Sequence, residues 1–227
     1  MLASSYTRPS LLRSARHSAQ AALAALSLYV IGCAAPVDEA EGSVPGAVDA
    51  TAQALYGCPG GGYQGHYLVY ADFSGEHLPD TNFCGADLYE ARFDVAYLRR
   101  STFYGADLFG ASFIDADLQA CDLYGASLLV GRFERADLRR VRGYGANFGY
   151  GNFQDAKLQD ATLTGASFYS ATLTNANLSG THLEGADFRN ADLRGANLCN
   201  LRSRFRTLWS GALTDGNTQC WCGTRAC

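Results

Sequence analysis

The sequence has few of the residues on which a nucleic-acid-binding or catalytic surface depends. Only one of its 18 basic residues is a lysine, Lys157, and the formal net charge is −4. No strongly basic segment is present, which argues against binding to nucleic-acid phosphates. The four histidines are far apart, and no metalloprotease, P-loop, serine-hydrolase or paired Cys/His motif occurs. We therefore predict that the chain is not an enzyme and needs no cofactor.

A long apolar run is also missing near the N-terminus. The apolar stretch 21–31 follows a basic segment and is too short to span a bilayer. It ends in the tetrapeptide VIGC, at Cys33, which resembles the lipobox of a bacterial lipoprotein. The resemblance implies that 1–33 is a signal peptide, cut before Cys33, whose thiol is then lipidated. The protein would lie in the cell envelope, at the outer membrane or its periplasmic face; the alternative is an ordinary signal, cut just after Cys33, and a secreted protein.

Loss of the signal peptide would remove three basic residues and no acidic one. The remaining chain has 15 basic and 22 acidic residues, a net charge of −7. Residues 34–55 are rich in Ala, Gly, Pro and acidic residues, a composition that cannot build a core. We interpret 34–55 as a flexible linker that tethers the rest of the chain.

The rest of the chain is dominated by a repeat of five residues. Residues 71–200 divide into 26 consecutive blocks, and the third residue is Leu or Phe in all but one, where Gly143 stands. The first residue is Ala in 18 blocks, as in the tripeptides ADL at 106–108 and ANL at 176–178. A period of five fits neither an amphipathic helix nor a strand. It indicates a stacked repeat architecture.

These blocks resemble the pentapeptide-repeat family, whose pattern is A-(D/N)-L-x-x. The resemblance implies an all-β fold, a right-handed quadrilateral β-helix solenoid with four blocks per coil and inward-pointing first and third residues. The sequence supports a 20-residue coil independently, because every fourth block ends in glycine from Gly85 to Gly185. The 26 blocks then make about six to seven coils, and we expect the whole β-helix, with an irregular start, to span 56–200. The glycine column predicts a corner with positive φ, at the third residue of a type II turn.

Both ends of the repeat are irregular. Residues 56–70 are glycine-rich but have Leu68 at an expected centre, so we predict a ragged first coil there. After Leu198 the register fails, because Ser203 stands where a centre is expected. Apolar residues at roughly helical spacing follow, so we predict a capping segment over 201–213, with one short helix as its candidate form. The remainder of 201–227 is a cysteine-rich tail.

Seven cysteines remain once Cys33 is set aside. Cys121 occupies a small inward position, which predicts a buried thiol. The others lie near the two ends of the repeat, and export favours disulfides among them. We predict a Cys58–Cys84 bond and a bond from Cys199 to one of the three C-terminal cysteines. A metal site is the alternative for those three, but no CxxC pair or nearby His supports it, and we predict none. The set is Cys58, Cys84, Cys199, Cys220, Cys222 and Cys227.

The fourth and fifth residues of neighbouring blocks predict an aromatic stripe on the surface. A long exposed aromatic stripe is unusual on a monomer, and Tyr and Phe are favoured in protein contacts. The stripe therefore predicts a protein partner, a second copy of the chain included. The alternative is that the rings stack on one another and only stiffen the coil. The residues are Tyr89, Tyr104, Phe109, Tyr124, Leu129, Tyr144, Tyr150 and Tyr169.

A basic patch precedes this stripe along the coil. It comprises Arg99, Arg100, Arg139, Arg140 and Arg142. The patch could bind an anionic partner, a glycan or a lipid head group. Neighbouring acidic residues could instead balance its charge on a solvated face.

Two functional classes follow from the sequence, and a third remains open. The first is a non-catalytic, membrane-tethered scaffold that binds another protein through the aromatic stripe. The second comes from the resemblance, since some pentapeptide-repeat proteins mimic DNA and bind topoisomerases, which confers quinolone resistance. Such a protein must be cytoplasmic and carry a continuous acidic face. The predicted signal peptide contradicts the location, and the interspersed arginines interrupt the acidic face. The third is a structural surface rod without a dedicated partner.

Overall fold

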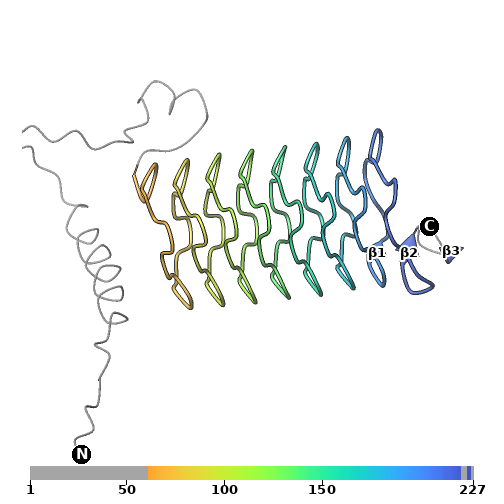
Figure 1. The fold of residues 1–227 in the computed structure, drawn as a ribbon, viewed down its shortest axis with the longest axis horizontal. Helices are drawn as coiled ribbons and strands as arrows, with labels where there is room; N and C mark the ends of the chain where they lie inside the picture. The colour runs from red at the N-terminus through yellow and green to blue at the C-terminus, as the bar shows by residue number, and fades with distance from the viewer. Residues whose placement is uncertain (1–60, 221–223, 226–227) are drawn as a thin grey trace, which may run out of the picture. The chain divides into compact units, whose positions relative to one another are not determined.

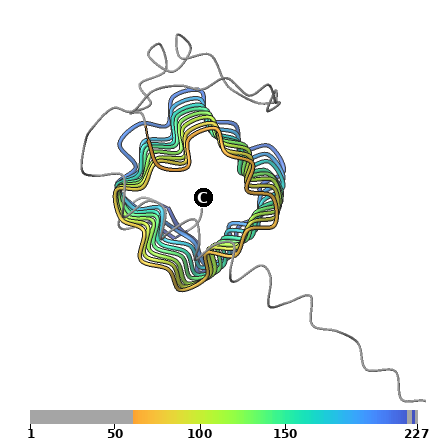
Figure 2. The same ribbon diagram turned by 90° about the vertical axis from the view of Figure 1, so that its left-hand side faces the viewer.

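The structure, a computed structural model, describes residues 61–220 and 224–225. The described chain winds into stacked coils of square cross-section (Figures 1 and 2). Successive coils are joined by parallel bridges between residues 20 apart, such as Asp87↔Asp107 and Asp107↔Ser127. These bridges confirm the predicted 20-residue coil. Residues 1–60, with the predicted signal peptide and linker, lie outside the described part.

The backbone hydrogen bonds explain why Asp or Asn so often follows Ala in a block. In block 106–110, the second N–H donates to the preceding coil (Asp107 N to Ala86 O, 3.0 Å), and the third and fifth donate to the following coil at 2.7 and 2.9 Å. The first N–H closes the turn from the previous block. The fourth N–H, that of Phe109, has no backbone partner among the described residues, and Asp107 Oδ1 accepts it at 3.1 Å. In the same way, Asp122 Oδ1 accepts from the Tyr124 N–H and Asn147 Oδ1 from the Gly149 N–H, each at 3.1 Å. We call this contact a cap.

Removing this cap should cost stability, whereas removing only its charge should not. We expect Asp107→Ala to lower the free energy of unfolding by about 1 kcal/mol, because the Phe109 N–H loses its acceptor. Asp107→Asn keeps a side-chain oxygen in place and should change stability by only a few tenths of a kcal/mol. Urea denaturation, with unfolding monitored by circular dichroism, measures the stability of both variants. Equal stabilities of the two variants would contradict the assignment.

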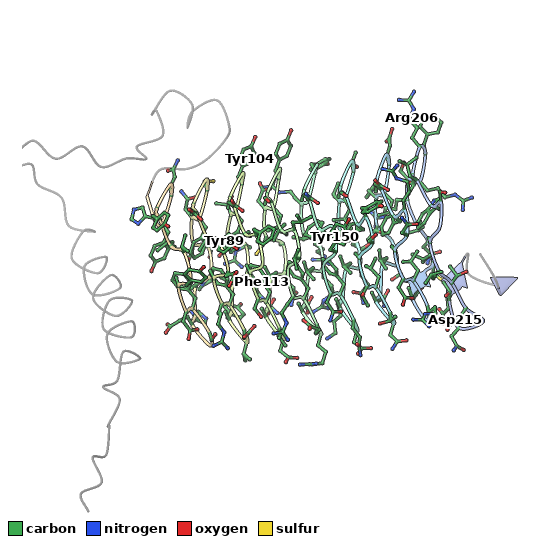
Figure 3. The ribbon with its side chains drawn as sticks, in the orientation of Figure 1. Tyr89, Tyr104, Phe113, Tyr150, Arg206 and Asp215 are labelled. Carbon is green, nitrogen blue, oxygen red and sulfur yellow. The ribbon has the colours of Figure 1, made fainter. Side chains whose placement is uncertain are left out.

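The core is built from columns of centre residues stacked from coil to coil. The longest aromatic column runs from Phe73 through Phe113 to Phe153, with ring centroids 4.5–5.2 Å apart and planes nearly parallel. Phe113, labelled in Figure 3, is fully buried in this column. A neighbouring column ends in the stacked pair Phe188–Trp209, 4.8 Å apart. The centre residues between the ends are fully buried, as are the small first residues.

Every corner of the coil has positive φ at the fifth residue, not only the glycine corner. The prediction is confirmed at Gly85, Gly105 and Gly125, with φ of 60–62°. Eighteen non-glycine residues, Val130 and Arg140 among them, also have φ of 50–61°. The turn is closed by a bond such as Ala111 N to Leu108 O, 3.0 Å. The left-handed conformation is thus a property of the turn, which tertiary contacts impose on residues that disfavour it.

The predicted helix in 201–213 is wrong. This segment continues the coil with one inserted residue, so that bridges join His182↔Ser203 and Asp187↔Leu208 at a spacing of 21. Ser203 is therefore a second residue, not a misplaced centre, and Trp209 becomes the centre that covers Phe188. The periodic apolar residues that suggested a helix occupy coil positions instead.

The C-terminal end closes with a small sheet of the order β1-β2-β3. β1 (Asn197–Leu198) pairs in parallel with β2 (Gln219–Cys220), which pairs in antiparallel fashion with β3 (Thr224–Arg225). The hydroxyl of Thr218 donates to Leu193 O at 3.0 Å and that of Thr207 to Leu183 O at 2.7 Å. Side chains therefore satisfy carbonyls at this end of the coil.

The N-terminal end of the described coil starts earlier than its Leu/Phe pattern. Tyr63 is buried and stacks on Phe83 at 5.0 Å, so it extends the column of centre residues by one coil. The predicted first coil is therefore present in its described part, 61–70, with Tyr63 as a centre residue that the Leu/Phe pattern does not include. No helix in the described residues has the length and apolarity needed to cross a membrane.

Candidate functional site

The predicted aromatic stripe is divided between two adjacent corners of the coil. The first row, which we call the tyrosine ladder, consists of Tyr104, Tyr124 and Tyr144. The rings of Tyr104 and Tyr124 are stacked 4.8 Å apart with an interplanar angle of 1°, and Tyr144 is tilted by 37° to Tyr124 at 6.1 Å. Tyr124 and Tyr144 remain 47% and 41% exposed. In Figure 3 Tyr104 projects outward from the upper edge of the coil.

The second row, the aromatic ridge, lies on the next corner and comprises Tyr89, Phe109, Leu129, Tyr150 and Tyr169. The rings of Tyr89 and Phe109 are stacked 5.3 Å apart at 4°. Tyr150 is 56% exposed and meets Tyr169 edge to face at 5.6 Å. Figure 3 places Tyr89 and Tyr150 across the middle of the coil, away from Tyr104.

The ring geometry accommodates both readings of the stripe. Stacking within each row covers ring faces, which stiffens the coil along its axis. Tyr124, Tyr144 and Tyr150 nevertheless remain 47%, 41% and 56% exposed. These rows can therefore contact a partner with edges and hydroxyls, but the stacked members offer it little free ring face.

The basic patch is largely neutralised by carboxylates. Arg99 pairs with Asp117 at 2.8 Å and Arg139 with Asp137 at 2.7 Å. Arg100 forms a two-bond pair with Asp80 and holds the pKa of that carboxyl below its ordinary value. Arg142 likewise pairs with Asp122 at 2.6 Å, whereas no ion pair in the described part of the chain involves Arg140. This surface therefore offers an anionic partner little uncompensated charge.

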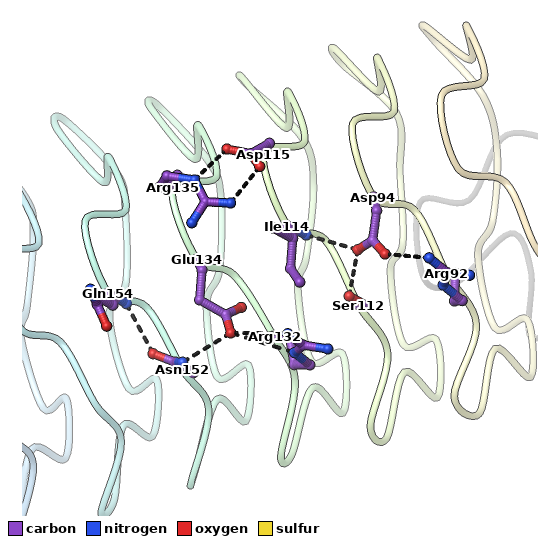
Figure 4. A network of polar contacts seen from close by, with 10 residues as sticks. All are labelled: Arg92, Asp94, Ser112, Ile114, Asp115, Arg132, Glu134, Arg135, Asn152 and Gln154. Carbon is purple, nitrogen blue, oxygen red and sulfur yellow. Dashed lines mark hydrogen bonds and ion pairs between the residues drawn. The ribbon is translucent and has the colours of Figure 1, made fainter.

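A third surface, at the corner shown in Figure 4, is a network of polar contacts between coils. Asp94 accepts from Arg92 at 2.9 Å and from the backbone of Ile114 at 3.1 Å, and it also hydrogen-bonds Ser112. Farther along, Glu134 accepts from Asn152 at 3.0 Å. Because these groups bond mostly to one another, the network ties successive coils together and is a poor candidate site.

The cysteines follow the predictions only in part. Cys121 is a buried free thiol, as predicted; it donates to Leu98 O at 2.9 Å, and burial raises its pKa. Cys84 takes part in a disulfide, but Cys58 lies outside the described residues, so their pairing stays a prediction. Cys199 is a buried thiol whose sulfur lies 3.9 Å from Gln219 Oε1, where a disulfide was predicted. β2 aligns with β1 through backbone bonds, which hold the tail without that disulfide.

Two features of this surface were missed at the sequence level. The first is the capping role of second-position Asp and Asn residues, which the A-(D/N)-L pattern signals once the fourth N–H is known to need an acceptor. The second is the face between the two aromatic rows, whose outward residues are Asp87, Asp107, Ser127, Asn147 and Ser167; we call it the Asp107 face. No group of three His, Cys, Asp or Glu residues within 61–220 is arranged to hold a metal ion. Cys33, Cys222 and Cys227 lie outside the described residues.

The chain matches a family model described as pentapeptide repeats. Eight copies match, over residues 67–103, 94–128, 102–142, 132–165 and 166–200, which together span more than half of the chain. A comparison with curated proteins finds no match.

Several solved structures are similar to this chain. QnrB1, a plasmid-mediated fluoroquinolone resistance protein, is 16% identical over 65% of this chain and 85% of its own, with a TM-score of 0.37. HetL, a pentapeptide repeat protein involved in heterocyst differentiation regulation in the cyanobacterium Nostoc, is 23% identical over 71% and 92%, with a TM-score of 0.23. A pentapeptide repeat protein of the Arabidopsis thaliana thylakoid lumen is 31% identical over 60% and 77%, with a TM-score of 0.22.

Proposed function

The chain belongs to the pentapeptide-repeat family, and we propose that it is a non-catalytic, exported scaffold that binds another protein through the tyrosine ladder and the aromatic ridge. The lipobox-like sequence at Cys33 supports a lipid anchor, with 34–55 as the tether. The proposal places the coil in the cell envelope, where its partner would also lie.

The observation that carries the proposal is the exposure of aromatic residues on two adjacent corners. Tyr124, Tyr144 and Tyr150 are each more than 40% exposed. Side chains that served only to stiffen the coil would gain more from deeper burial. Exposed Tyr residues in rows are instead typical of contact surfaces, because they add area at low cost in conformational entropy.

Photo-crosslinking tests the contact surface. We expect a photoreactive phenylalanine analogue at Tyr124 or Tyr150 to form a cross-link to one and the same protein in the native host. The analogue at exposed Gln154, on the corner shown in Figure 4, should form none and is the matched control. The double substitution Phe109→Ser/Tyr124→Ser should abolish the cross-link from Tyr150. Unchanged cross-linking and an unchanged oligomeric state in that variant would make the rows purely structural.

Fractionation of the native host tests the tether. We expect the protein to carry lipid label and to sediment with membranes, and Cys33→Ala to abolish both, because the anchoring thiol is gone. An exported but unlabelled protein would show that the ordinary secretory signal operates instead. An uncleaved cytosolic protein would contradict export altogether.

That last outcome would favour the competing function, binding of a topoisomerase by mimicry of DNA. Mimicry requires a continuous acidic face, which the described surface lacks. Arginines pair with carboxylates on several faces, as in Arg100–Asp80, Arg135–Asp115 and Arg194–Asp192. A supercoiling assay with the purified chain would then decide, and full gyrase activity in excess protein would exclude the mimic.

A further inference from the structure

The Asp107 face carries acidic groups that the rest of the chain does not neutralise. No ion pair within the described residues involves Asp87, Asp107 or Glu90. Asp87 and Asp107 bridge one another in successive coils, and Glu90 stands at the adjoining corner. The side chain of Glu90 hydrogen-bonds Tyr89 and raises the pKa of that phenol, and Asp107 adds a smaller effect of the same sign. The three carboxylates therefore gather around one end of the aromatic ridge.

The chain itself shows what such a carboxylate binds when an aromatic ring lies beside it. Farther along the same face, Arg189 donates two bonds to Asp187, at 2.9 and 2.7 Å, and its guanidinium lies 5.7 Å from the centre of the Tyr169 ring. Asp187 still caps the Arg189 N–H at 3.0 Å, so capping and arginine binding are compatible. A guanidinium held by a carboxylate and an aromatic side chain gains from both contacts.

The equivalent arginine is absent where the carboxylates are unpaired. Residues 80 apart occupy the same corner four coils away. Tyr89 is therefore equivalent to Tyr169, and Phe109 is equivalent to Arg189. Asp107 Oδ1 consequently accepts from the Phe109 N–H, but within the described residues no arginine or lysine side chain forms an ion pair with Asp107. At this end of the aromatic ridge, rings and carboxylates lie together, but no arginine of the described residues forms an ion pair with Asp87, Asp107 or Glu90.

The corner on the other side of the Asp107 face carries the tyrosine ladder at its fourth residues, whereas its fifth residues add no side chain. Seven successive fifth residues of this corner are glycine, from Gly65 to Gly185. The turn does not demand glycine, because the other corners hold Arg, Asp, Glu and Val at the same positive φ. Packing does not demand it either, since a Cβ added at Gly85, Gly105 or Gly125 would meet no heavy atom within 4 Å. A chain lying along the Asp107 face would therefore meet no side chain from these glycines.

We propose that the Asp107 face binds an extended, arginine-rich segment of a partner protein. Guanidinium groups would pair with Asp87, Asp107 and Glu90 and pack beside Tyr89 and Phe109. The inference rests on the proposed function, because it specifies the chemistry of the protein that the aromatic rows contact.

The test uses the purified full-length chain and a fluorescein-labelled peptide of alternating arginine and serine. We expect the peptide to bind at physiological salt, and the variant Asp87→Asn/Glu90→Gln/Asp107→Asn to bind about tenfold more weakly. Asn retains the capping oxygen, so this variant keeps the fold while it loses three charges. The matched control, Asp115→Asn/Asp137→Asn/Asp192→Asn, removes three charges on other faces and should change the affinity less than twofold. Fluorescence anisotropy measures all three affinities.

Equal binding to the native chain and the first variant would overturn the inference, as would equal weakening by the control, which would indicate attraction by net charge alone. A second labelled peptide, of alternating glutamate and serine, serves as the charge control, and a native chain that binds it more tightly than the arginine–serine peptide would overturn the inference too. These failures differ from failure of the proposed function. If the peptide does not bind while Tyr124 and Tyr150 cross-link a native protein, only the arginine chemistry is wrong. If no native protein cross-links, the proposed function fails whatever the peptide does.

Discussion

Replacing Phe113 by alanine is expected to lower the free energy of unfolding by about 3–5 kcal/mol, the range for loss of a fully buried phenylalanine. Its ring is stacked between Phe93 and Phe133, at 4.9 and 5.2 Å, and also meets Phe103 edge to face at 6.0 Å. The cavity cannot collapse readily, because the ladders on all four sides fix the distance between coils. Urea denaturation of the full-length chain, followed by circular dichroism, measures the loss.

Phe113→Leu is the matched control. Leucine is the other residue found at centres, and the same column continues as Leu173 and Leu193. We expect a loss of about 1 kcal/mol, since the ring contacts disappear while most of the volume stays filled. If Phe113→Ala lowers the free energy of unfolding no more than Phe113→Leu does, the stacked column does not hold the coils together. A broad transition in both variants would instead show that the coils unfold in separate steps.

The repeating part of the fold could be predicted because each position has one physical role. Leu or Phe at the third position and Ala at the first fill the axis, and these residues recur with a period that only a stacked coil satisfies. The 20-residue coil followed from residues such as Gly85 and Gly105, and the bridge Asp87↔Asp107 confirms that residues 20 apart are neighbours in successive coils. The buried thiol of Cys121 followed from the same positional logic.

The features that could not be predicted from the sequence depend on contacts between coils. One inserted residue before Ser203 shifts the register, and five-residue spacing alone cannot distinguish a shifted coil from a cap. The division of the aromatic rows between two corners, with Tyr104 on one and Tyr89 on the next, required knowing how each corner is oriented. The pairing of Arg100 with Asp80 likewise links residues 20 apart through side-chain conformations that no pattern encodes.

The repeat rule, by which alanine is the favoured first residue of a block, and the structure predict opposite effects of Gly131→Ala on stability. Gly131 occupies a first position, where alanine stands one coil away on the same face at Ala111 and is the commonest residue in the repeat. On the repeat rule, alanine should stabilise the chain by about 0.4–1 kcal/mol by restricting the unfolded state. In the structure, an added Cβ would lie 2.7 Å from Phe133 Cε2 and 2.9 Å from Leu128 O.

We infer that the crowding at Gly131 is transmitted through Phe133 from a large residue in the neighbouring column. Phe148 stands where the preceding coil has Leu128, and its ring meets Phe133 at 6.0 Å and Phe153 at 5.5 Å, both edge to face. Gly131 and Gly151 lie against those two rings, and a Cβ at Gly151 would lie 2.8 Å from Phe153 Cε2. The extra volume of Phe148 is therefore accommodated where the chain has glycine in place of alanine.

We accordingly expect Gly131→Ala to lower the free energy of unfolding by about 1–3 kcal/mol, the usual cost of overpacking. Gly125→Ala is the control, because its Cβ would meet nothing within 4 Å and only the positive φ of 62° opposes it, at about 1 kcal/mol. Adding Phe148→Leu should relieve much of the cost of Gly131→Ala, a coupling that a double-mutant cycle in urea measures. A stabilising Gly131→Ala, or strict additivity with Phe148→Leu, would show that Gly131 does not compensate for the ring of Phe148 and that the repeat rule governs this position.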